Sequence, residues 1–155
     1  MQLPNEALIL ITSALPVLEL RGAIPLGLNL HEPLLKVSLL AIVGNLIPIP
    51  ALLFFLEPVS SKLRKFYLFE KFFSWLFART RKKSKLIEKY EFFGLIIFVA
   101  IPLPMTGAWT ACIAASLLKM PFKRAFTAIS IGVSIAALIV AGLCCGGAYV
   151  INSLD

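Results

Sequence analysis

The sequence has few residues that could build a metal centre or a catalytic triad. It contains one histidine, His31, and three cysteines, Cys112, Cys144 and Cys145, all of which lie in apolar segments. No spacing typical of metal ligands joins them, so we expect the cysteines to pack as small apolar residues and His31 to lie at the surface. We therefore expect no enzyme, no metal and no cofactor.

Charge is missing from two long stretches, residues 92–118 and 125–154. The whole chain is 59% hydrophobic, with a mean hydropathy of +0.92, whereas a soluble domain is about half apolar. Uncharged apolar runs of about 18 residues or more are typical of bilayer spans. The sequence therefore predicts an all-α integral membrane protein.

Basic residues are absent before Arg21, so we expect no cleavable signal peptide, which would begin with a basic region. Ten of the fifteen Lys and Arg residues fall between Lys62 and Lys89, and Lys119, Lys123 and Arg124 form a second cluster. Because Lys and Arg in short loops mark the cytoplasmic side, we expect both clusters to face the cytoplasm. The setting we expect is a prokaryotic plasma membrane.

Four apolar segments, 6–31, 33–57, 92–118 and 122–151, surround a polar connector at 58–91. Segments 33–57 and 122–151 have the length of full spans. The other two are interrupted by the helix breakers in "ELRGAIP" (19–25) and "PLPMTG" (102–107). Each remaining arm has about ten residues, which rise about 15 Å, half of a roughly 30 Å hydrocarbon core. We expect two re-entrant hairpins, the alternative for 92–118 being one kinked spanning helix.

The pattern therefore predicts that each half of the chain, 6–57 and 92–151, forms a hairpin followed by a span. If neither hairpin crosses the membrane, both basic clusters lie on one side, both termini are extracytoplasmic and the halves have opposite orientations. Inverted repeats with broken helices near the midplane are typical of secondary transporters. Polar hairpin tips would need cover, so we expect a homodimer.

The first break carries two charges, Glu19 and Arg21, beside Gly22 and Pro25. Ionisable groups within a membrane segment are rare and usually functional. Arg21 would bind an anionic head group, for which its planar guanidinium is suited, and Glu19 would bind or release a proton. The alternative is an ion pair that only stabilises the hairpin.

The second break contains Pro102, Pro104, Thr106 and Gly107, followed by Trp109. Thr106 is a suitable N-cap for the returning arm. That arm would then point free N–H groups at the midplane and form an anion site without a formal charge, with Trp109 beside it. The alternative is a tight turn that packs against the first hairpin.

Small residues recur every four positions in the last span, at Ala128, Gly132 and Ala136. Such a face lets helices approach closely, within one protomer or in a dimer.

The connector has apolar residues at helical spacing beside a basic run, which is typical of an amphipathic helix in the membrane interface. Its alternative role is to set the topology, and we expect no nucleic-acid partner. The apolar positions are Phe66, Phe69, Phe73 and Leu76.

The motifs "ELRGAIPLG" and "IPLPMTGAW" together resemble the family of putative small multi-drug export proteins, which is grouped with the DedA-like superfamily and its VTT, or SNARE-associated, core. The resemblance implies two opposed re-entrant hairpins, lipid translocation and proton coupling. Glu19 matches the acidic residue of the first DedA hairpin, and "MPFKRAF" (120–126) resembles the stretch after the second, which adds Arg124. The second hairpin lacks the DedA arginines, so Arg21 would supply the positive charge.

We therefore predict a transporter of an anionic lipid, a polyprenyl phosphate or a phospholipid, and we expect a proton or another ion to be coupled to the transport. One alternative is an exporter of drugs or other small solutes, which would depend more on Glu19 than on Arg21. Another is a non-transport scaffold or a holin-like protein, which would not need paired breaks with buried charge.

Overall fold

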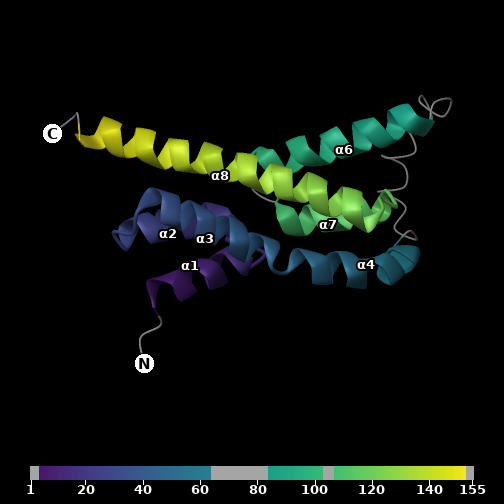
Figure 1. Cartoon of the computed structure of the whole chain (residues 1–155), viewed down its shortest axis with the longest axis horizontal. Helices are drawn as coiled ribbons and strands as arrows, with labels where there is room; N and C mark the ends of the chain where they lie inside the picture. The colour runs from purple at the N-terminus through teal and green to yellow at the C-terminus, as the bar shows by residue number, and fades with distance from the viewer. Residues whose placement is uncertain (1–3, 64–83, 103–106, 153–155) are drawn as a thin grey trace.

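The described part of the chain is built from helices, and it contains no strand. The computed structural model describes residues 4–63, 84–102 and 107–152, so the all-α prediction is confirmed there. In chain order (Figure 1) the helices are α1 (Asn5–Ala14), α2 (Glu19–Asn29), α3 (Leu34–Leu46), α4 (Ile49–Leu63), α6 (Ser84–Ala100), α7 (Ala108–Leu117) and α8 (Phe122–Asn152).

Two stretches are long and apolar enough to cross a membrane, Leu34–Leu56 and Phe122–Gly146. The first comprises α3 and the first part of α4, which lie nearly end to end (Figure 1). Pro48 and Pro50 lie at the joint, where they cannot donate the usual helical hydrogen bonds. The Leu52 N–H still donates to Pro48 O at 3.0 Å, so the chain continues past the break.

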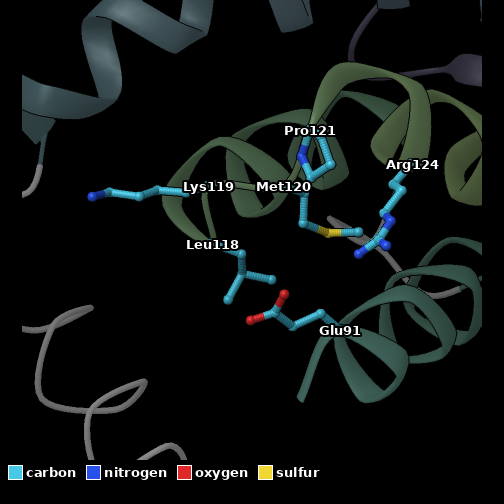
Figure 2. A pocket seen from close by; sticks show the side chains of 6 residues that line it. All are labelled: Glu91, Leu118, Lys119, Met120, Pro121 and Arg124. Atoms are coloured by element: carbon cyan, nitrogen blue, oxygen red, sulfur yellow. The ribbon is translucent and has the colours of Figure 1, made fainter. Parts of the chain in front are cut away.

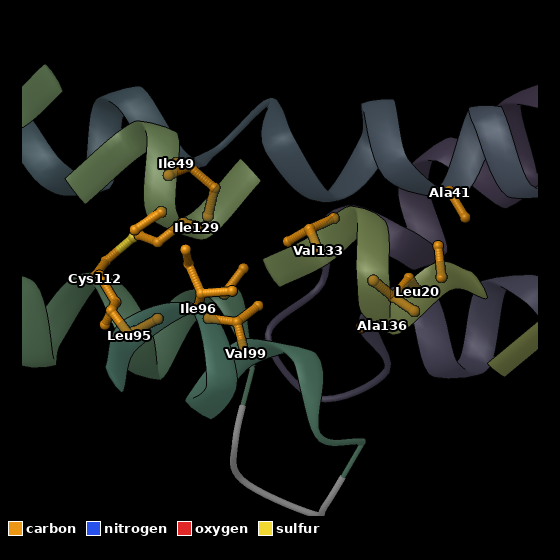
Figure 3. Packing of buried hydrophobic residues seen from close by; sticks show 14 of the residues in the cluster. Leu20, Ala41, Ile49, Leu95, Ile96, Val99, Cys112, Ile129, Val133 and Ala136 are labelled. Atoms are coloured by element: carbon orange, nitrogen blue, oxygen red, sulfur yellow. The ribbon is translucent and has the colours of Figure 1, made fainter. Parts of the chain in front are cut away.

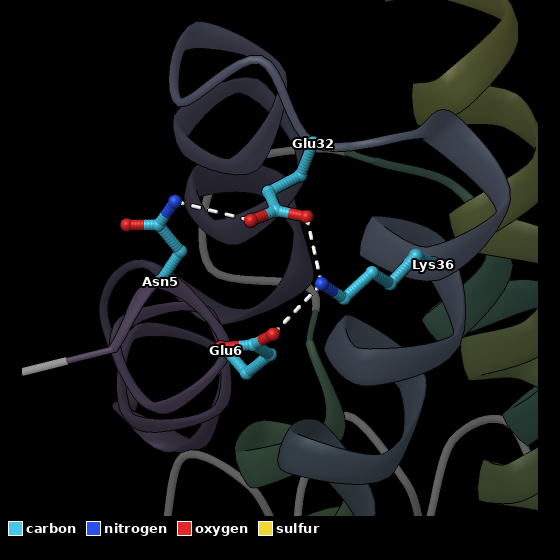
Figure 4. A network of polar contacts seen from close by, with 4 residues as sticks. All are labelled: Asn5, Glu6, Glu32 and Lys36. Carbon is cyan, nitrogen blue, oxygen red and sulfur yellow. Dashed lines mark hydrogen bonds and ion pairs between the residues drawn. The ribbon is translucent and has the colours of Figure 1, made fainter.

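Helices α1 and α2 form a pair. At its open end, where α1 begins and α2 ends, polar side chains bond to one another (Figure 4). Asn5 Nδ2 donates to Glu32 Oε1 at 3.0 Å, and Lys36 Nζ lies 2.7 Å from Glu6 Oε1 and 2.8 Å from Glu32 Oε2. The hydrogen bond from Lys36 holds the pKa of Glu32 below its usual range. The start of α1 therefore lies beside the loop that joins α2 to α3.

Small residues bring α1 close to α3. A Cβ atom on Gly44 would lie 2.6 Å from Leu10 O, and the buried Ser13 hydroxyl donates to Ala41 O. A larger side chain at position 44 would push the two helices apart.

The small-residue face of α8 packs against α6 within the protomer. Ala128 and Ala136 are buried, and a Cβ atom on Gly132 would lie 2.6 Å from Val99 Cβ and 3.0 Å from Ile96 O. Figure 3 shows Ile96 and Val99 beside α8 in the apolar cluster. The predicted close approach is thus confirmed inside one chain.

We expect Gly132→Ala to destabilise the protein by about 1–3 kcal/mol, the usual effect of overpacking. Neither neighbour can yield easily, since one is a backbone carbonyl and the other a β-branched Cβ. The matched control is Gly142→Ala in the same helix, where an added Cβ meets nothing within 4 Å; it should be neutral or slightly stabilising. Thermal unfolding in detergent compares them, and equal stability of the two variants would contradict this packing.

The second helix pair, α6 and α7, differs from the expected hairpin with two ten-residue arms. Helix α6 has 17 residues, about 25 Å, and begins at Ser84, inside the segment 58–91 expected to be the connector. The apolar pattern located only the part after residue 92. The Lys- and Glu-rich residues before it are also good helix formers, and they extend the helix. Most of the predicted interfacial helix, including Phe66 to Leu76, lies outside the described residues.

Candidate functional site

Glu19 lies at the first break, where α1 ends and α2 begins. The chain turns through residues 15–18, with Val17 89% exposed, and Glu19 then adopts a left-handed φ of 48°. For a residue with a side chain this conformation costs on the order of 1–3 kcal/mol. The strained backbone places the carboxylate inside the protein, where Glu19 is only 6% exposed.

The carboxylate of Glu19 lies against the first turn of α7. The Trp109 N–H donates to Glu19 Oε1 at 3.4 Å, and a Cβ atom on Gly107 would collide with both carboxylate oxygens. Thr110 Oγ1 completes the turn, accepting from Gly107 N–H at 2.9 Å and donating to Gly107 O at 3.0 Å. A negative group at this end of a helix is stabilised by the helix dipole.

Trp109 makes a second link to the first break. Its Nε1–H donates to Ala14 O, the last residue of α1, at 3.2 Å. The first turn of α7 therefore bonds to both sides of the turn at 15–18, through Ala14 and Glu19. These contacts join residues about 90 positions apart in sequence.

The family model described as "Putative small multi-drug export protein" matches residues 19–139. The chain belongs to this family. The matched stretch begins at Glu19 and includes α2 and α7, the two helices that meet at the Glu19 carboxylate. Helix α1 precedes the matched stretch. No curated protein and no solved structure matches the chain significantly. Family membership and the two long apolar helices place the protein in a membrane.

The prediction that Thr106 caps the returning arm of the second hairpin, now α7, is wrong. The N-cap of α7 is Gly107 rather than Thr106, because only a residue without a side chain leaves room for the Glu19 carboxylate. The predicted open anion site is filled by the chain's own carboxylate, and α7 packs against the first break, as the alternative stated. Thr106 and Pro104 themselves lie outside the described residues.

The first break also lies earlier than predicted. The whole of "ELRGAIP" is helical in α2, with Pro25 inside the helix, and the turn falls at 15–18 instead. Pro25 has no N–H to contribute to the helical hydrogen bonds, which the helix tolerates. Arg21 is half-buried, and its charge interacts with that of Glu19. Gly22 is close-packed, since a Cβ there would lie 3.0 Å from Leu18 Cβ.

At the second break, Pro102 follows the end of α6 and is half-buried. This position fits a residue that cannot continue a helix.

Arg124 is not brought to Glu19. It lines an open hollow of about 480 Å³ between α6 and the α7–α8 corner, where Lys119 points away from the other side chains (Figure 2). The hollow follows the C-terminal end of α7, whereas Glu19 contacts its N-terminal end. The other lining residues are Glu91, Leu118, Met120 and Pro121.

Proposed function

We propose that this protein is a membrane carrier that exports small lipophilic cations in exchange for protons, with Glu19 as the exchanging group. The observation that carries the proposal is the position of the Glu19 carboxylate, buried at the contact between α2 and α7. A buried carboxylate in a membrane segment attracts either a proton or a cation. It can hold only one of them at a time, and this competition couples their movements.

The carboxylate also controls the contact between the helices. When ionised, Glu19 is held at the positive end of α7 by the dipole and by Trp109 N–H. Protonation removes the charge and weakens this attraction, so that α2 and α7 can part. A cation arriving at the opened contact would displace the proton and restore the charge balance.

The architecture in the proposal is a pair of opposed re-entrant hairpins, α1–α2 and α6–α7, each followed by a span. Both basic clusters then face the cytoplasm of a prokaryotic cell. In hydrocarbon, non-helical backbone must be covered by protein, yet Val17 at the first tip is 89% exposed. A second copy of the chain would provide that cover, which supports a homodimer.

A second candidate is translocation of an anionic lipid, the activity that the resemblance to DedA proteins implies. It is favoured by Arg21, whose charge lies near Glu19, and by the positive end of α7. A lipid phosphate would replace the Glu19 carboxylate there. A scaffold or holin-like role gives no reason for a buried carboxylate at this contact.

Transport in proteoliposomes separates the two candidates. Wild type and Arg21→Ala are compared with ethidium and with a fluorescent polyprenyl phosphate under a pH gradient. The exporter proposal expects ethidium movement in both proteins, with Arg21→Ala within a few-fold of wild type, and no lipid movement. Lipid movement that is lost in Arg21→Ala, without ethidium transport, would establish the second candidate instead.

A further inference from the structure

Asn45, near the end of α3, has a buried side chain for which the structure describes no hydrogen-bond partner. It is 1% exposed, and neither Oδ1 nor Nδ2 is bonded to any residue that the structure describes. Buried amides in folded proteins nearly always find partners, because an unpaired polar atom destabilises the fold. A leucine of similar size would pack in the same place without that cost.

The surroundings of Asn45 are apolar. Ala41 lies one helical turn before it in α3, and Ile49 is the first residue of α4; both are fully buried. Figure 3 shows these two residues facing α8, with Val133 between them. The Asn45 amide therefore lies on the same side as Ala41 of α3, the helix that packs against α8.

The same level of the span is where the helix is interrupted. Pro48 and Pro50 cannot donate hydrogen bonds, so Gly44 O and Leu46 O lose their usual helical donors. Broken helices in transporters line substrate sites near the middle of the membrane. An unpaired amide beside such a break can bond a polar molecule that enters there.

We propose that Asn45 hydrogen-bonds an uncharged polar group, such as an amine, hydroxyl or carbonyl, on the lipophilic molecule that the protein exports. This inference rests on the proposed function and deepens it. Glu19 selects for positive charge, whereas Asn45 selects for a neutral donor or acceptor on the apolar body of the substrate. The Asn45 amide can bond either kind of group, because Nδ2 donates hydrogen bonds and Oδ1 accepts them.

Two dyes that differ in hydrogen bonding test the inference. Ethidium carries two amino groups, and tetraphenylphosphonium is a lipophilic cation with none. Asn45→Leu should raise the ethidium concentration for half-maximal transport roughly tenfold, the effect of one lost hydrogen bond. Transport of tetraphenylphosphonium should be unchanged, and the melting temperature should be equal or higher.

The controls are Asn29→Leu, the same substitution at an exposed position at the end of α2, and Glu19→Gln. Asn29→Leu should leave both dyes unaffected, and Glu19→Gln should reduce both. If Asn45→Leu reduces both dyes equally, or neither, while Glu19→Gln reduces both, the Asn45 inference is wrong and the exporter proposal stands. If wild type moves neither dye, both are wrong.

Discussion

Replacing Glu19 by glutamine is expected to reduce proton-driven export by on the order of 100-fold while the fold is retained. The glutamine Oε1 can still accept the hydrogen bond from Trp109 N–H that Glu19 accepts. The amide can neither exchange a proton nor balance the charge of a cation. Removing one partner of a buried charge pair costs about 3–5 kcal/mol, which corresponds to at least 100-fold in binding.

The matched control is Glu6→Gln, the same change at a carboxylate in the first turn of α1. Glu6 pairs with Lys36 at the open end of the first helix pair, away from the α2–α7 contact, so its variant should transport within a few-fold of wild type. Ethidium efflux from proteoliposomes under an imposed pH gradient measures both variants. Export by Glu19→Gln at the wild-type rate would show that another group couples the proton.

The second large effect is expected from Gly107→Ala. The added Cβ would collide with the Glu19 carboxylate, whereas the Gly107 φ of −128° is accessible to alanine. The substitution therefore acts through the contact rather than through backbone strain. Expelling the carboxylate from the end of α7 should cost about 1–3 kcal/mol through overpacking, with a further contribution of up to about 2 kcal/mol from the lost helix-dipole interaction.

Gly94→Ala in α6 is the control for this prediction, because an added Cβ there meets nothing within 4 Å. It should be as stable as wild type or slightly more so. The melting temperature in detergent and ethidium efflux are measured for both variants. If Gly107→Ala behaves like Gly94→Ala, the carboxylate does not lie where we describe it.

Composition and local pattern are sufficient to predict the two long apolar stretches. The expected spans at 33–57 and 122–151 correspond to the apolar helical stretches at Leu34–Leu56 and Phe122–Gly146. The role of Gly132 is also predictable, because its spacing from Ala128 and Ala136 is a property of one helix. These features depend on residues close together in sequence.

The details of the site depend on contacts that local pattern does not contain. "ELRGAIP" carries Gly and Pro and therefore predicts the break, yet the turn lies at 15–18 and is followed by Glu19, which is held in a left-handed conformation beside α7. Nothing near Gly107 in sequence indicates that a carboxylate from the first helix pair lies against it. Our sequence-based expectations do not include Asn45, for whose side chain the structure describes no hydrogen-bond partner, although a lone Asn in an apolar span beside two prolines is a signal that points to it.

The central claim is that the Glu19 carboxylate lies directly on Gly107 and joins the two helix pairs, and a double-mutant cycle tests it most directly. The free energy of unfolding is measured for wild type, Gly107→Ala, Glu19→Ala and the double variant. If the claim holds, Gly107→Ala is strongly destabilising in wild type and nearly neutral once Glu19 is alanine, with a coupling above about 1 kcal/mol. Costs that add to within about 0.5 kcal/mol would contradict it, since independent sites behave in that way.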